Sequence, residues 1–327
     1  MPRHSFVIKK LAMKSQKKQL KTQFLLLISA LFSILTISCN RANDAYDLSQ
    51  CKVYILGTCH SNHLFSELNY SLNDINGLIG DLKPDLICFE MTPEALNTET
   101  EGYFPTENTH IIETAKQKHI KYVPVDWRSP LCEQNKPAVL TESQQKFLRT
   151  AQQKTEGLVF NFLMQNNWKG YYDFVQKDTG FHQSIKAQHD IKIDFLGEEQ
   201  DGYWLTRNKK ITDKLIKTIM KEKPKVVLVT FGLHHKYILE ENLKNYYGIN
   251  AFPVPLQKAR PGQPVNENVM ERWEKNKANL ERIMQNENTD AALKQKIKSS
   301  RRIQELDKFI KAEGVPNISL KKLMGGK

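Results

Sequence analysis

The stretch VVLVTFGLHH, residues 226–235, joins a run of mostly apolar residues to a glycine and two histidines. Both alternating sets of positions between Val226 and Phe231 are almost wholly apolar, which is typical of a strand buried on both faces of a parallel sheet. We therefore predict a central strand over Val226–Phe231, with Gly232 and the two histidines just beyond its carboxyl end.

Further short apolar runs predict the neighbouring strands. The predicted strands are Val53–Leu56, Leu86–Phe89, Tyr122–Val125 and Ile191–Leu196, with Ala251–Leu256 as a candidate last strand. Apolar residues at helical spacing predict helices over residues 65–82, 106–119, 205–220 and 237–246. This alternation predicts an α/β fold with a parallel-type central sheet flanked by helices, spanning residues 52–258.

Two helical additions to this domain are predicted. Residues 141–190 are aromatic and mostly helical in pattern, and they are too long for a simple crossover between strands. We interpret them as a helical insertion and a candidate lid. Residues 259–327 form a charged C-terminal segment whose apolar spacing predicts a helical pair, over residues 266–284 and 289–312. The pair is expected to pack against the domain or against a partner.

The N-terminus has the pattern of a bacterial lipoprotein signal over residues 1–38. A lysine-rich stretch without acidic residues precedes the apolar run FLLLISALFSILTIS, Phe24–Ser38, and Cys39 follows it. That run is short for a transmembrane helix, which needs about 20 apolar residues. We predict lipidation of Cys39, a polar tether over residues 39–51, and a lipid-anchored location in the cell envelope, outside the cytoplasm. The alternatives are an uncleaved anchor, or ordinary cleavage that leaves Cys39 free.

The net charge of +12 is unevenly distributed along the chain. Seven basic residues lie within residues 1–38, residues 259–327 carry about +6, and residues 39–258 carry about −1. Glutamate and lysine alternate in the C-terminal segment instead of forming basic blocks, so we predict no nucleic-acid partner.

The remaining cysteines match no metal-binding or redox spacing. Cys51, Cys59, Cys88 and Cys132 contain no CxxC pair, and an exported protein could pair some of them. Cys88 lies inside a predicted strand and is interpreted as a small core residue.

Histidines and carboxylates follow several of the predicted strands. In parallel α/β sheets, ligands gather just beyond the carboxyl ends of the strands. The residues in these positions are His60, Glu90, Asp126 with Arg128 close behind, Glu198 and Glu199, and His234 with His235. If the strands are correct, two Gly-x-x-His turns and several carboxylates meet at one edge of the sheet, where Gly57 and Gly232 would allow the sharp turns.

Imidazole nitrogens and carboxylate oxygens together suit a divalent metal such as manganese, cobalt or zinc. A bound metal lowers the pKa of a water molecule, and a spare carboxylate can accept the proton. Each residue also has a simpler interpretation. A single histidine is often structural, and an acidic residue after a strand is often a helix N-cap, which could explain Asp126 or Glu198.

Four motifs carry a resemblance to a known superfamily. They are Gly57-Thr58-Cys59-His60, then Pro84-Asp85 before a strand that ends at Glu90, then Arg207-Asn208 opening a helix, and Gly232-Leu233-His234-His235. In this order they resemble the TraB/GumN and Tiki group, which is distantly related to erythromycin esterases and ChaN-like lipoproteins. The likeness covers roughly residues 52–256. His234 and Cys59 depart from the commoner pattern.

The resemblance implies an α/β core with His60, Glu90 and His235 in the site and Arg207 nearby. Tiki-like members are described as metal-dependent peptidases, which favours a metal held by His60, Glu90 and His235, with Asp126 as a further candidate ligand. Erythromycin-esterase-like members use similar residues without a metal, and ChaN-like members bind haem. The hypotheses are therefore a metal-dependent hydrolase of a peptide or small molecule, a metal-free esterase-like hydrolase, or a non-catalytic lipoprotein that binds haem, metal or a peptide.

Overall fold

The computed structural model describes residues 46–129, 140–166, 170–256, 260 and 262–323, without the side chains of residues 321 and 323. The chain divides into two compact units, Met1–Asp47 and Leu48–Lys327, and the description below concerns the second. The predicted signal peptide, Cys39, most of the tether and Cys132 lie outside the described residues. None of the described helices is long and apolar enough to cross a membrane.

The α/β fold is confirmed, with one sheet of four parallel strands in the order β1-β4-β2-β3. The strands are β1 (Lys52–Thr58), β2 (Leu86–Phe89), β3 (Lys121–Pro124) and β4 (Val226–Gly232). All four residues of β2 are buried, as expected for a strand with helices on both faces. Asp85 fixes the start of the central pair, because its Oδ2 accepts hydrogen bonds from the backbone N–H groups of Lys225 and Val226.

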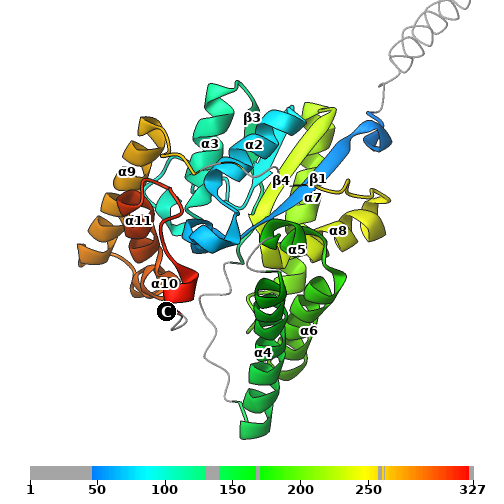
Figure 1. Ribbon diagram of the computed structural model, residues 1–327, viewed down its shortest axis with the longest axis vertical. Helices are drawn as coiled ribbons and strands as arrows, with labels where there is room; N and C mark the ends of the chain where they lie inside the picture. Colours follow the sequence, from blue (N-terminus) through cyan, green and yellow to red (C-terminus); the bar gives the residue numbers. More distant parts are fainter. Residues whose placement is uncertain (1–45, 130–139, 167–169, 257–259, 261, 324–327) are drawn as a thin grey trace, which may run out of the picture. The chain divides into compact units, whose positions relative to one another are not determined.

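Helices cover both faces of the sheet. Helices α2 and α3 lie on one face and α7 and α8 on the other, an arrangement that can be followed in Figure 1. The helices of the α/β body are α2 (Leu72–Leu82), α3 (Glu107–Gln117), α7 (Trp204–Glu222) and α8 (Leu233–Tyr247). The short 3-10 turns are η1 (Leu48–Gln50), η2 (His60–Leu64), η3 (Ser66–Leu68) and η4 (Glu101–Tyr103).

The helical insertion consists of α4 (Glu142–Gln165), α5 (Tyr171–Lys177) and α6 (Thr179–Leu196). In Figure 1, α4 and α6 lie side by side as a long pair. The predicted strand at Ile191–Leu196 is wrong, because these residues are the end of α6. Their side chains are mostly half-buried, and Phe195 packs on Phe147 of α4 with ring centroids 6.0 Å apart. The short apolar run at residues 191–196 therefore reflects a helix that packs against α4, and not a buried strand.

Other predicted elements shift for local reasons. The helix expected from residue 65 begins at Leu72, where Ser71 and Asp74 form a capping box. The candidate last strand, Ala251–Leu256, makes only one bridge, between Phe252 and Tyr54. Pro253 and Pro255 lack the N–H groups that a longer ladder would need.

The C-terminal segment packs against the α/β body. It contains α9 (Glu267–Gln285), α10 (Ala291–Ser300), α11 (Arg302–Lys311) and α12 (Leu320–Leu323). The helix predicted over residues 289–312 is divided at Arg301, which has a left-handed backbone (φ 56°). Arg272 of α9 joins Glu101 and Glu113 of the body, with N–O distances of 2.6 and 2.7 Å.

Candidate active site

The register of the sheet brings the predicted site residues to one edge. Thr58 pairs with Gly232, and Phe89 pairs with both Thr230 and Pro124, so the strands end nearly level. His60, Glu90, Asp126 and His235 therefore follow at the same edge. Glu198 and Glu199 follow helix α6 instead of a strand, and the carboxylate of Glu198 accepts a hydrogen bond from the N–H of Thr206 in the first turn of α7.

His60 is held by a carboxylate that the sequence did not reveal. Its Nδ1 lies 2.8 Å from Oε1 of Glu107, whose side chain is buried in the first turn of α3. Burial would lower the pKa of His60, but the charge and the hydrogen bond of Glu107, together with the charge of Glu90, raise that pKa to about 9. His60 also has a left-handed backbone (φ 50°), which is uncommon outside glycine and is often found at functional sites.

His235 is held through the same ring nitrogen. Its Nδ1–H donates to Oδ1 of Asn208 at 2.6 Å, while Nδ2 of Asn208 donates to the carbonyl of Trp204 at 2.8 Å. The indole of Trp204 lies over the imidazole, with ring centroids 4.5 Å apart. Burial and then the charge of Arg207 lower the pKa of His235 well below its usual value, so the imidazole is neutral at neutral pH.

Glu90 lies between the two histidines. Its Oε2 accepts the N–H of Gly232 at 2.8 Å, and its Oε1 lies 3.2 Å from a guanidinium nitrogen of Arg207 and 3.9 Å from Nε2 of His235. Burial would raise the pKa of Glu90, but the positive charges of Arg207, His60 and Arg128 hold it below its usual range. Glu90 is therefore ionised at neutral pH.

Gly232 is required by space and not by a special backbone angle. The sequence suggested that Gly57 and Gly232 permit sharp turns, but neither has a positive φ. A Cβ on Gly232 would lie 2.7 Å from Nε2 of His60 and 3.2 Å from Oε2 of Glu90. Nε2 of His60 and the carboxylate of Glu90 thus converge on this glycine, and the site has no room for a side chain there.

Two arginines neutralise the acidic residues of the edge. Arg207 is buried, and its Nε and one terminal nitrogen donate to the two oxygens of Asp126 at 2.9 and 2.8 Å. Arg128 has a side chain that is 41% exposed, and it contacts Asp126 at 2.9 Å and Glu90 at 3.6 Å. Asp126 is fully buried among these donors, which makes it a structural anchor for Arg207.

Gly57 is clamped by the helical insertion. Gln176 of α5 accepts the N–H of Gly57 at 2.9 Å and donates to its carbonyl at 2.8 Å, and the hydroxyl of Tyr70 donates to the same carbonyl at 2.7 Å. These contacts fix the end of β1, three residues before His60. No pattern in the sequence indicated a role for Glu107, Trp204 or Gln176. Asn208 differs from these residues, because it follows Arg207 in one of the four sequence motifs.

The imidazole nitrogens and carboxylate oxygens at this edge are of the chemical types that bind divalent metals. Each histidine donates its Nδ1–H to an oxygen and has its Nε2 on the side of Glu90 and Gly232, as is usual for metal-binding histidines. Because the pKa of His60 is raised to about 9, its Nε2 carries a proton at neutral pH that a bound metal would have to displace. Asp126 does not fit as a ligand, because both its oxygens already accept from arginine. In the part of the chain that the structure describes, no group of three or more His, Cys, Asp or Glu side chains is close enough together to hold a metal ion.

One cavity, of about 360 Å³, reaches the start of α8. It lies between α4, α6 and the first turn of α8, and Gln152, Gln188, Lys192 and His234 are among its lining residues. His234 directly precedes His235 in the chain. A larger cavity, of about 520 Å³, lies elsewhere on α8, and none of His60, Glu90 and His235 lines either cavity.

The His60–Glu107 pair predicts a pH dependence in protein treated with a chelator. The pKa of His60 is raised to about 9 and that of Glu107 is lowered to about 2. The stability from this pair is therefore greatest between the ordinary values of 4.5 and 6.5, and it is lost as pH rises through about 9 or falls through about 2.

Imidazole NMR of wild type and Glu107→Gln tests this expectation. His60 should titrate near pH 9 in the wild type and at a much lower pH in the variant. The difference in unfolding free energy between the two proteins should shrink toward pH 9. A wild-type His60 that titrates at or below 6.5 would contradict the pairing.

Comparisons with family models, curated proteins and solved structures gave no match to this chain. The assignment of the site therefore rests on the contacts described above.

Proposed function

We propose that this protein is a hydrolase whose site is formed by His60, Glu90 and His235, with a divalent metal as its cofactor. The observation that carries the proposal is the matched anchoring of the two histidines. Glu107 and Asn208 hold the two Nδ1 atoms, Nε2 of His60 converges with Glu90 on Gly232, and Nε2 of His235 lies 3.9 Å from Oε1 of Glu90. The resemblance to the TraB/GumN and Tiki group supports the same reaction class.

The residues of the chain have separate roles in such a reaction. His60, His235 and Glu90 would hold the metal, which when bound makes water a stronger acid and so a source of hydroxide near neutral pH. Arg128, which is partly exposed beside Glu90, is placed to stabilise negative charge that develops on a substrate carbonyl oxygen. Trp204 covers His235 and limits the access of bulk water to it.

A metal-free hydrolase is the second candidate, and the contacts of Glu90 favour it. Both of its oxygens already have a hydrogen-bond donor, from Gly232 and from Arg207, so it is less available to a metal. In that case the neutral His235, oriented by Asn208, would accept a proton from water directly. The substrate class, a peptide or a small ester, is the same in both candidates.

We further propose that the protein is anchored by a lipid on Cys39 in the cell envelope, outside the cytoplasm. The support for this proposal is the basic and apolar pattern of residues 1–38.

The experiment compares metal content and hydrolysis in the full-length chain, purified in detergent, with His60→Ala and His235→Ala. After incubation with manganese, cobalt or zinc, we expect about one metal per wild-type chain and loss of that metal in both variants. Hydrolysis of a peptide library or of p-nitrophenyl esters should fall about a hundredfold or more. His119→Asn is the control, because His119 is exposed and has a left-handed backbone that asparagine tolerates.

The outcomes separate the candidates. Hydrolysis that needs both histidines but no metal would establish the metal-free enzyme. Absence of both metal and hydrolysis would overturn the proposal, and a haem absorption band would then favour a binding lipoprotein.

A further inference from the structure

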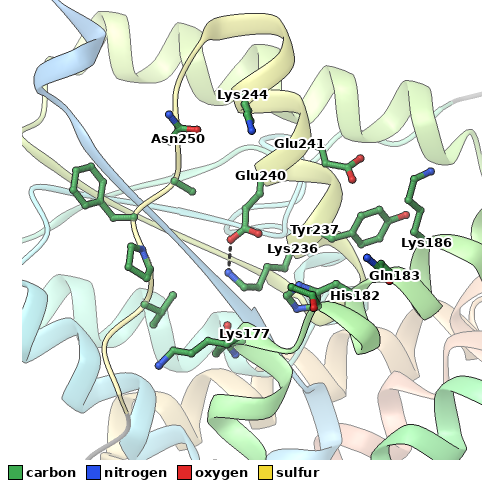
Figure 2. A pocket seen from close by; sticks show the side chains of 16 residues that line it. Lys177, His182, Gln183, Lys186, Lys236, Tyr237, Glu240, Glu241, Lys244 and Asn250 are labelled. Carbon is green, nitrogen blue, oxygen red and sulfur yellow. Dashed lines mark hydrogen bonds and ion pairs between the residues drawn. The ribbon is translucent and has the colours of Figure 1, made fainter.

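The residues that line the larger cavity have no role in the proposed reaction. It has a volume of about 520 Å³ and lies along the outer edge of β1, between α8, the region where α5 meets α6, and residues 250–254. Figure 2 shows Lys236 and Glu240 of α8 near its centre, paired with each other. The volume is within the range of small-molecule sites, about 300–1,000 Å³.

The strand edge beside the cavity is already closed. The N–H of Phe252 donates to the carbonyl of Val53 at 2.8 Å, and the ammonium of Lys236 donates to the carbonyl of Ile55 at 2.8 Å. Gln176 takes both backbone groups of Gly57. An extended peptide therefore cannot add to β1 as a further strand, and the shape favours a compact ligand.

The charges around the cavity favour an anion. Lys177, Lys186 and Lys244 come from α5, α6 and α8, and Glu241 is the acidic lining residue that remains once Lys236 and Glu240 are paired. Lys177 and Lys186 contact aspartates one helical turn away, but these pairs are partly exposed to solvent and hold the lysines only weakly. The lining is therefore positive overall.

One wall of the cavity is apolar. Phe252, Pro253 and Val254 form it, and Phe252 is 40% exposed. An exposed aromatic side chain next to lysines suits a ligand with an apolar part as well as a charge. We propose that this cavity is a binding site for a small organic anion that carries an aromatic or apolar group.

Calorimetric titration of the full-length chain tests this proposal with four probes. They are phenyl phosphate, phenylacetate, inorganic phosphate and the neutral benzyl alcohol. We expect at least one aromatic anion to bind, and inorganic phosphate and benzyl alcohol to bind at least about tenfold more weakly. The preferred aromatic probe identifies the anion as a phosphate or a carboxylate.

Three exposed positions provide the variants, so that folding is preserved. Lys244→Glu should weaken the binding of the aromatic anion by about tenfold or more, because it reverses one charge of the cavity lining. Lys217→Glu, on the exposed face of α7 and outside the cavity, makes the same charge change and should have no such effect. Phe252→Ser should weaken the binding of the aromatic anion but leave the binding of inorganic phosphate unchanged.

The proposal would be overturned by three results. The first is that neither aromatic anion binds at millimolar concentration. The second is that Lys244→Glu and Lys217→Glu change the affinity equally. The third is that benzyl alcohol binds as strongly as the anions. None of them depends on metal or hydrolysis at His60, so the two proposals can fail separately.

Discussion

Replacing Arg207 by methionine is expected to lower the free energy of unfolding by about 3–5 kcal/mol, the usual cost of breaking a buried ion pair from one side. Arg207 is 8% exposed and Asp126 is fully buried. The variant removes two hydrogen bonds to Asp126 and one to Glu90, which leaves two buried carboxylates with little compensation. Urea denaturation followed by circular dichroism measures the change.

Arg128→Met is the matched control for this prediction. Arg128 contacts the same two carboxylates, but its side chain is 41% exposed, so its loss should cost about 1 kcal/mol or less. The double variant Arg207→Met, Asp126→Asn should recover part of the lost stability, because it also removes the buried charge. Equal destabilisation by Arg207→Met and Arg128→Met would show that burial of the pair is unimportant.

Replacing Trp273 by alanine is expected to cost about 3–5 kcal/mol, as is typical of a fully buried aromatic residue. Trp273 of α9 is 0% exposed, and its Nε1–H donates to the carbonyl of Thr106 at 3.0 Å. Its ring lies 5.3 Å from that of Phe309 in α11. The residue thus joins the C-terminal helices to each other and to the start of α3.

Urea unfolding should show this loss as one shifted transition. Tyr246→Ala, at a 59% exposed aromatic residue of α8, is the control and should change stability by about 0.5 kcal/mol. Trp273→Phe should be intermediate, because it keeps most of the packing and loses the hydrogen bond. A small early transition with an unchanged main transition would mean that the C-terminal helices are not part of the same cooperative unit.

The sheet was largely predictable from the sequence. Strands buried on both faces leave continuous apolar runs, and β1, β2, β3 and β4 all lie where such runs were found. The run at Ile191–Leu196 has a similar composition, but it belongs to a helix that packs against α4. Short apolar runs do not distinguish these two cases, because the deciding contact comes from residues distant in the chain.

The site was predictable only in its outline. The rule that ligands gather at the carboxyl ends of parallel strands placed His60, Glu90, Asp126 and His235 at one edge. This rule could not show that the carboxylate of Asp126 already accepts hydrogen bonds from arginines. Nor could it show that Glu107 and Asn208 orient the two histidines. Glu107 lies in another helix, 47 residues beyond His60, and no local spacing connects the two.

The position of β4 in the sheet has a consequence for folding. β4 forms the centre of the sheet between β1 and β2, yet it follows almost all of the α/β body in the chain. Closing so long a loop is slow, and among the strands that the structure describes only β2 and β3 can pair before β4 joins them. Since His235 follows β4 and His60 follows β1, the two histidines meet only when this last strand is inserted. An incomplete or newly made chain would therefore lack the site, however much of its helical structure had already formed.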